Sequence, residues 1–227
     1  MSLKRHRRLT ARMREAPSTY GSGIAEVEVL PAALLDIGVR YMQDLKKKAL
    51  DVSQTLQKAG IPHAVIGGLA LAAHLARANP LAERNTQDLD ILLNKADLER
   101  AKIAMAPLGY RYRRVLRLHA FMPQKRGAHF VEGVHIIWAG EKVRPEYLHA
   151  TPTLPPVSST RIDGEIYYLQ LLDLVVMKLT SFRHKDITHI QDLLYWKLLT
   201  PAIQRKLPPD LLLRLEDIKR DTVRESG

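Results

Sequence analysis

The sequence predicts an α+β fold, in which one core of strands and helices is followed by a C-terminal helical segment. Between residues 31 and 170, short apolar runs typical of buried strands stand among helical patterns. After residue 170, only helical patterns follow. The chain has 227 residues, of which 46% are apolar, and this is enough for one sizeable core with a small helical appendage.

The core is expected to begin with a long helix, a strand and a second helix. Pro31 precedes apolar residues at helical spacing, and Gly60 ends that pattern. Residues 63–66 have the composition of a short buried strand. The glycine pair that follows marks a tight turn, and the alanine- and leucine-rich residues 69–78 favour a helix.

A loop with Pro80 leads to the next predicted strand, residues 88–93. Asn94 is a suitable N-cap for a helix over residues 95–107, and Gly109 is suited to end it.

Two longer runs, residues 110–121 and 129–138, are expected to form strands that pair as antiparallel neighbours. Residues 139–160 are rich in Pro and Thr and are predicted to be irregular. Asp163-Gly164 predicts a two-residue hairpin turn, because both residue types tolerate a positive φ. Helices are then expected over about 171–182, 186–199 and 209–223.

Composition excludes several classes of protein. There is no cysteine, so neither a disulfide framework nor a thiolate metal site is available. No apolar run approaches the roughly 20 residues that span a bilayer, and the basic N-terminus lacks the apolar segment of a signal peptide. We therefore expect a soluble, cytoplasmic protein without a membrane partner.

The formal net charge of +11 comes from two segments. Residues 1–15 carry six Lys or Arg and one Glu, and we expect residues 1–30 to be a basic, disordered tail, with a nucleic-acid-binding arm as the alternative. Residues 111–144 carry eight Lys or Arg and two Glu among apolar residues, which indicates folded strands with a basic face. The expected organisation is thus a tail, a core over 31–170 and a helical segment over 171–227.

Four arginines of the second segment suggest an RNA acceptor. They are Arg111, Arg113, Arg114 and Arg117. If they line a nucleic-acid path, RNA binding should weaken steeply with salt, because each phosphate contact releases condensed counterions. The alternative is that they solvate an outer sheet face.

Asp88 and Asp90 are the first candidates for chemistry. Residues two apart on a strand point to the same side, so these carboxylates are presented together. Mg²⁺ prefers oxygen ligands and typically uses one or two carboxylates plus substrate phosphates. Gly67 and Gly68 allow a triphosphate to approach backbone N–H groups at a helix N-terminus. The glycine pair and the aspartate pair are each weak evidence alone. Their order and spacing together indicate phosphoryl-group or nucleotidyl-group transfer.

These segments resemble the nucleotidyltransferases of the DNA polymerase beta superfamily. The residues that carry the resemblance are Ile66-Gly67-Gly68-Leu69-Ala70 and Arg84-Asn85-Thr86-Gln87-Asp88-Leu89-Asp90-Ile91-Leu92. A second stretch, residues 177–186 with Asp192 to follow, looks like the lysine and Arg-Asp motifs of a branch that includes abortive-infection toxins. The resemblance covers roughly residues 60–200.

The resemblance implies a mixed sheet with helices on it and a divalent metal, Mg²⁺ or Mn²⁺, held by Asp88 and Asp90. It implies that the nucleoside triphosphate lies near the glycine pair. Further candidate nucleotide contacts are Arg84, Thr86, Lys178, Arg183 and Asp186. For Lys178 the alternative is a lysine that snorkels from an amphipathic helix, and for Arg183, Lys185 and Asp186 it is a set of local helix ion pairs.

One position departs from the family pattern. Active members carry a third carboxylate on a later strand, and His135 is the residue that aligns there. Glu132 has the opposite strand parity unless Gly133 sits in a bulge, and Glu141 lies beyond the strand. We therefore treat His135 as the third catalytic candidate and the carboxylate set as incomplete.

Three functions remain open from the sequence. The first is transfer of a nucleoside monophosphate from a nucleoside triphosphate to a hydroxyl of RNA, protein or a small molecule. The second is a catalytically degenerate nucleotidyltransferase-like protein that binds nucleotide or a partner. The third is a basic nucleic-acid-binding module without a nucleotide site. The toxin-like branch adds a cognate antitoxin as an expected partner.

Overall fold

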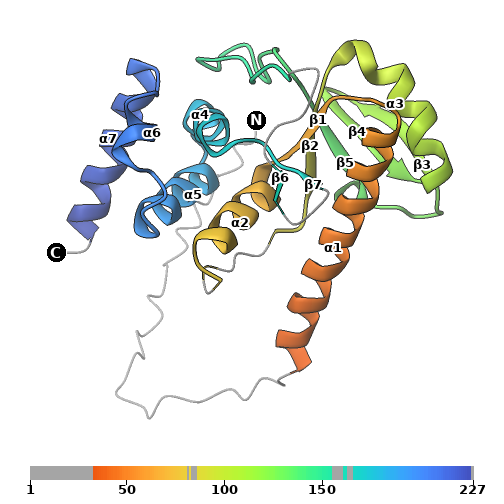
Figure 1. The fold of residues 1–227 in the computed structure, drawn as a ribbon, viewed down its shortest axis with the longest axis horizontal. Coiled ribbons are helices and arrows are strands. Elements are labelled where there is room, and N and C mark those ends of the chain that lie inside the picture. Colours follow the sequence, from red (N-terminus) through yellow and green to blue (C-terminus); the bar gives the residue numbers. More distant parts are fainter. Residues whose placement is uncertain (1–32, 81, 83–85, 155–160, 163–165, 226–227) are drawn as a thin grey trace, which may run out of the picture.

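A computed structural model of the protein describes residues 33–80, 82, 86–154, 161–162 and 166–225. The expected basic tail, residues 1–30, lies outside these ranges, as does Arg84. Within them the architecture is an α+β fold with a mixed five-stranded sheet, as the sequence predicts (Figure 1). None of the described helices is long and apolar enough to cross a bilayer.

The five strands of the main sheet lie in the order β1-β2-β5-β4-β3. Their bounds are β1 His63–Ile66, β2 Leu89–Leu93, β3 Tyr110–Val115, β4 Leu118–Pro123 and β5 Val134–Trp138. Strands β2 and β5 are parallel, and the other neighbours are antiparallel. A small second sheet pairs β6 Arg161–Ile162 with β7 Ile166–Tyr167.

Helices cover both sides of the main sheet. The longer helices are α1 Ala33–Lys58, α2 Gly67–Ala78, α3 Leu98–Met105, α4 Leu171–Ser181, α5 His184–Tyr195 and α7 Pro209–Glu225, with the short α6 Pro201–Gln204 between the last two. Helices α1 and α3 pack together on one side, and α2 lies on the other with α4 beside it (Figure 1). Helix α5 packs on α4, and α7 packs on both.

Most early elements match their predicted ranges. Strand β1 has the predicted bounds, and α1 ends two residues before Gly60, whose φ is +63°. Helix α2 begins at Gly67, two residues earlier than expected. The predicted helix over residues 95–107 is instead a short α-helix between two 3-10 turns, η1 Lys95–Asp97 and η2 Ala106–Leu108. Gly109 ends it with φ +78°, and the Asn94 side chain makes no capping bond.

The prediction of a single strand over residues 110–121 is wrong. This run is the hairpin β3–β4, which turns at Leu116 with φ +55°. The predicted antiparallel pairing with the next run is confirmed, because β4 pairs β5. The predicted hairpin around Asp163-Gly164 pairs Ile162 with Ile166, which leaves three intervening residues rather than two; these lie outside the described residues.

Candidate active site

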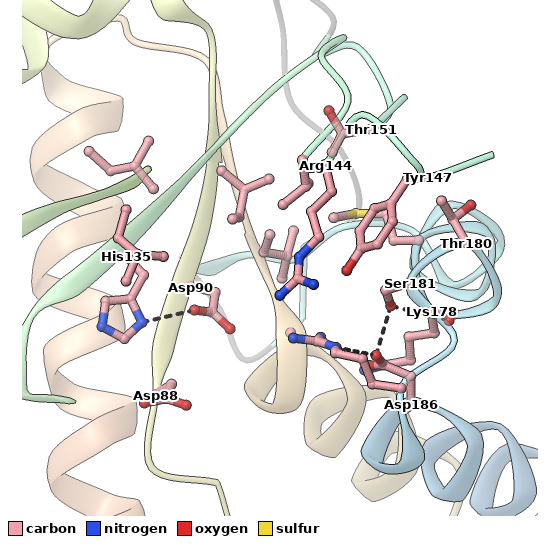
Figure 2. A pocket seen from close by; sticks show the side chains of 18 of the residues that line it. Asp88, Asp90, His135, Arg144, Tyr147, Thr151, Lys178, Thr180, Ser181 and Asp186 are labelled. Atoms are coloured by element: carbon pink, nitrogen blue, oxygen red, sulfur yellow. Dashed lines mark hydrogen bonds and ion pairs between the residues drawn. The ribbon is translucent and has the colours of Figure 1, made fainter. Parts of the chain in front are cut away.

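A cavity of about 610 Å³ opens where the end of β1, the start of β2, strand β5, the α4–α5 junction and residues 143–151 meet. It gathers most of the residues that the sequence singled out. Those lining it are Gly67, Asp88, Asp90, His135, Lys178, Arg183 and Asp186 (Figure 2). Gly68 and Thr86 are described but do not line the cavity. Residues far apart in the chain thus meet at one cavity.

The glycine pair makes room for side chains of the second motif. Gly67 has φ +72°, and a Cβ there would lie 2.3 Å from Asp90 Oδ2. A Cβ on Gly68 would lie 2.4 Å from Thr86 Oγ1. Real Cβ atoms do not approach that closely, so both positions need glycine to let α2 begin directly against β2. The first turn of α2 has no acidic residue and no side-chain cap, so its N–H groups are suited to an anion.

His135 lies beside Asp90, where the sequence placed it. The parallel register of β2 and β5 pairs these two residues, and His135 Nδ1 is 3.2 Å from Asp90 Oδ1. The other ring nitrogen, Nε2, is 3.0 Å from the Phe130 carbonyl oxygen, and the Phe130 ring stacks on the imidazole at 4.7 Å. The His135 ring is therefore fixed on both edges and on one face.

Both neighbours of the His135 ring are acceptors, so both nitrogens donate only when the imidazole carries two protons. In accord with this, the bond to Asp90 raises the pKa of His135 above its ordinary value, and the smaller effect of burial opposes the rise. In its doubly protonated form, the imidazole offsets part of the negative charge of Asp90. Direct ligation of a metal by His135 would require loss of one of these protons.

The two glutamates that the sequence offered as alternatives to His135 are both paired with lysines. Glu132 pairs with Lys125 and accepts a bond from the His129 backbone N–H at 3.1 Å. Glu141 pairs with Lys95 at 3.1 Å. Within the described ranges, no group of three His, Asp or Glu side chains is spaced to hold a metal ion.

Two carboxylates still match what Mg²⁺ or Mn²⁺ takes from a protein when substrate phosphates complete its ligands. Asp90 is 28% exposed and Asp88 lies two residues away along the same chain segment, so both can reach a ligand in the cavity. The donor set therefore fits a divalent metal together with a triphosphate.

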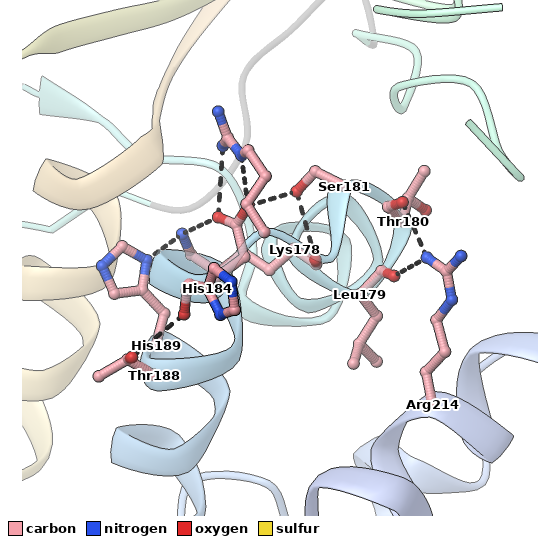
Figure 3. A network of polar contacts seen from close by, with 10 residues as sticks. Lys178, Leu179, Thr180, Ser181, His184, Thr188, His189 and Arg214 are labelled. Atoms are coloured by element: carbon pink, nitrogen blue, oxygen red, sulfur yellow. Dashed lines mark hydrogen bonds and ion pairs between the residues drawn. The ribbon is translucent and has the colours of Figure 1, made fainter. Parts of the chain in front are cut away.

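The far wall of the cavity is a buried ion-pair network at the α4–α5 junction (Figure 3). Lys178 is only 5% exposed, so the snorkelling alternative is wrong. Its Nζ donates to His189 Nδ1 at 2.5 Å and lies 3.5 Å from Asp186 Oδ1. Burial lowers the pKa of Lys178 to about 8, and Asp186 offsets part of that effect.

Asp186 is the centre of that network. Its Oδ2 accepts bonds from Ser181 Oγ and from Arg183 Nε, each at 2.7 Å. Burial would raise the pKa of Asp186, but Arg183, Ser181 and Lys178 together hold it below its ordinary value. The alternative of a local helix ion pair is therefore observed for Arg183 and Asp186, three residues apart at the start of α5.

Arg183 interacts electrostatically with both sides of the cavity, the sheet carboxylates and the α4–α5 junction. Burial opposes its charge, but Asp186 and, more weakly, Tyr147 and Asp90 outweigh this and raise the pKa of Arg183. The guanidinium is thus a stable cation between the sheet carboxylates and the α4–α5 junction.

Sequence reasoning missed three residues at or near the site. Arg144 and Tyr147 line the cavity from a segment that the sequence predicted only as irregular. Lys48, on the buried side of α1, donates to the carbonyl oxygens of Glu132 and Gly133 at 2.7 Å each and so holds the start of β5. Its position next to the buried residues Leu45 and Ala49 in the helical pattern is the one signal that could have identified Lys48.

Solved structures with a similar fold include two of ANT(2'')-Ia. One is the solution structure of this antibiotic-resistance factor (14% identity, 79% of this chain and 85% of that chain covered, TM-score 0.41). The other is its crystal structure with adenylyl-2''-tobramycin (15% identity, 78% and 88% covered, TM-score 0.38). A third is the Megavirus polyadenylate synthase (13% identity, 79% and 41% covered, TM-score 0.41).

No curated protein sequence matches this chain. A family model described as "Uncharacterised nucleotidyltransferase" matches residues 28–219, which include every described residue of the cavity. The resemblance to nucleotidyltransferases is thereby confirmed at the level of the family, while the toxin-like branch stays a prediction. The chain belongs to this nucleotidyltransferase family.

Proposed function

We propose that this protein transfers a nucleoside monophosphate from a nucleoside triphosphate to a hydroxyl group of an acceptor. The observation that carries the proposal is the position of Asp88 and Asp90 on one wall of a cavity that also opens onto the start of α2. Two partly exposed carboxylates near a helix N-terminus without acidic residues suit a metal-bound triphosphate.

In the proposed reaction, the acceptor oxygen bonds to the α-phosphorus, and the bond from that phosphorus to the bridging oxygen of the β-phosphate breaks. Pyrophosphate leaves, and the hydroxyl proton passes to a base. Asp88 and Asp90 would hold Mg²⁺ or Mn²⁺, which supplies stabilisation of the charge that develops on the phosphate oxygens. Gly67 and the α2 N–H groups would bind phosphate oxygens, and Arg183 would add a positive charge from the other wall.

We propose RNA as the acceptor class on the basis of one row of the sheet. Asp90, His135, Ala120 and Arg113 are paired in register across β2, β5, β4 and β3. Directly paired residues point to the same face, so exposed Arg113 shares the face of Asp90 at a distance of about 14 Å, the width of three strand spacings. Arg111 shares that face as well, and Arg117 lines the cavity.

His135 favours a second function, the catalytically degenerate nucleotide-binding protein. The family resemblance aligns its imidazole with the third carboxylate of active members, and the two glutamates weighed as alternatives, Glu132 and Glu141, pair with Lys125 and Lys95 instead. The toxin role and a cognate antitoxin stay predictions of the sequence.

The deciding experiment is incubation of the protein with labelled nucleoside triphosphates, Mg²⁺ or Mn²⁺, and total cellular RNA or protein. Labelled RNA from wild type, and none from the Asp88→Asn/Asp90→Asn variant, is expected. Label on protein instead would replace RNA as the acceptor class. Nucleotide binding without any labelled product would favour the degenerate protein.

A further inference from the structure

We propose that residues 140–152 form a triphosphate-binding loop, in which Arg144 binds the β- and γ-phosphates opposite Arg183. The inference rests on the proposed function, because it assigns part of the same nucleotide site.

The base of this loop is held together by three hydrogen bonds. Gly140 N–H donates to the Pro152 carbonyl at 3.1 Å, and Thr151 N–H donates to the Glu141 carbonyl at 3.0 Å. The Thr151 hydroxyl also donates to the Trp138 carbonyl at 2.5 Å, which joins the loop to the end of β5. Although it lacks helix and strand, the loop is closed at its base and continuous with the sheet.

The tip of the loop is also ordered. Tyr147 N–H donates to the Arg144 carbonyl at 3.1 Å, so these two residues bracket a turn. Two residues further on, His149 Nε2 contacts Asp210 Oδ2 at 2.8 Å and thereby ties the loop to the start of α7. A loop that is fixed at both base and tip presents Arg144 and Tyr147 from a defined position.

Both tip side chains point into the cavity between Asp90 and the α4–α5 junction (Figure 2). The Arg144 guanidinium lies 5.9 Å from the centre of the Tyr147 ring, which helps to orient it. It forms a solvent-exposed ion pair with Glu146, in which the nitrogen and oxygen atoms are 3.8 Å apart, beyond hydrogen-bonding distance. Among the described residues, the guanidinium of Arg144 has no hydrogen-bond acceptor, so its donors remain available to a ligand.

The ligand that fits this arrangement is a polyphosphate. Asp88 and Asp90 would fix the reacting phosphate, and the remaining two phosphates must then extend into the cavity. Arg144 enters that space from the loop, and Arg183 and Lys185 line it from the start of α5. A planar guanidinium with parallel N–H donors binds phosphate in a bidentate manner. Asp186 does not compete for Arg144, because Arg183, Ser181 and Lys178 already occupy it.

The test measures equilibrium binding of inorganic tripolyphosphate, ATP and AMP to wild type, Arg144→Ala and Arg144→Lys. Lys142→Ala is the matched control, because Lys142 is an exposed cation of the same loop that does not line the cavity. Arg144→Ala should weaken tripolyphosphate and ATP about tenfold, as expected for loss of charge-assisted hydrogen bonds, and should change AMP binding less than about twofold. Arg144→Lys should recover part of the loss, and Lys142→Ala should bind all three ligands as wild type does.

The outcomes separate this inference from the proposed function. Tripolyphosphate affinity that is the same in wild type and Arg144→Ala, or absent from wild type, overturns the inference even if nucleotide transfer is observed. An equal loss of AMP and ATP binding also overturns it, because Arg144 would then act on the nucleoside or on the fold. Tripolyphosphate binding that depends on Arg144, without ATP binding or transfer, would support the subsite and contradict the proposed function.

Discussion

Asp90 and Asp186 face the same cavity from opposite walls, but their surroundings differ. Asp90 is 28% exposed, and its bond to His135 at 3.2 Å involves one of its two oxygens. Asp186 is 2% exposed and contacts Ser181, Arg183 and Lys178. A carboxylate with spare oxygen capacity is suited to bind a ligand, whereas one with both oxygens occupied in the interior mainly fixes the structure. The comparison separates a carboxylate that is available to a ligand from one that fixes the surrounding structure.

The largest expected difference between the two carboxylates is in stability. Asp186→Ala leaves the buried cation of Lys178 without its carboxylate, so we expect the free energy of unfolding to fall by about 3–5 kcal/mol. Asp90→Ala removes a partly exposed group and should cost about 1 kcal/mol or less. Denaturant unfolding of both variants measures this. Equal stability of the two would show that the α4–α5 network does not support the fold.

The second prediction concerns transfer. Asp88→Asn and Asp90→Asn should each lower metal-dependent nucleotide transfer at least about 100-fold, because each removes a charged group that we propose as a metal ligand. Their melting temperatures should stay close to wild type. The matched control is Asp97→Asn, which removes an ion pair with Arg100 that does not line the cavity. Wild-type transfer in both site variants would exclude Asp88 and Asp90 as metal ligands.

A structural feature can be predicted from this sequence when it depends on residues that are neighbours in the chain. Local signals succeeded for the composition of β1 and for the glycine that ends the helix at Gly109. The choice of His135 came from the family resemblance, because no local pattern predicts that β2 and β5 pair Asp90 with it. The turn at Leu116 was missed because it has none of the Gly, Asn or Pro residues that normally mark a hairpin.

The cavity walls were only partly predictable. Motif residues such as Lys178 came from family resemblance, but their partners come from tertiary packing. The bond from Lys178 to His189 joins two helices, and Arg144 reaches the cavity only because a loop without periodic pattern is closed by hydrogen bonds of its own. The sequence pattern of a single helix or loop does not show which distant residues it will contact.

A third prediction uses the depressed pKa of Lys178. In the folded state this pKa is about 8, against about 10.5 for an unfolded lysine. Below pH 8 both states are protonated, and the folded state carries the full cost of the buried charge. Between pH 8 and 10.5 the unfolded chain binds more protons, so this lysine makes stability rise with pH, by about 1–3 kcal/mol in total.

Lys178→Met should lack that rise. The difference in unfolding free energy between Lys178→Met and wild type is therefore expected to shift in favour of wild type as the pH increases from 8 to 10.5. Other lysines titrate in both proteins and cancel in the difference. A pH-independent difference over this window would show that Lys178 keeps an ordinary pKa in the fold.

The smallest expected effect is at His135, and it tests whether this residue belongs to the proposed metal site. An aspartate there adds an oxygen donor and a negative charge beside Asp90, and Mg²⁺ prefers oxygen ligands. His135→Asp should therefore raise Mg²⁺-dependent transfer several-fold, up to about tenfold, which corresponds to about 1.4 kcal/mol.

In wild type Mn²⁺ should support faster transfer than Mg²⁺, because Mn²⁺ accepts nitrogen ligands more readily. The aspartate variant should reduce that preference. His135→Ala, which supplies neither donor nor charge, is the control for simple removal of the ring that stacks on Phe130. If the Asp and Ala variants have the same metal preference and transfer rate as wild type, His135 takes no part in the site, and its position opposite Asp90 in the sheet reflects packing alone.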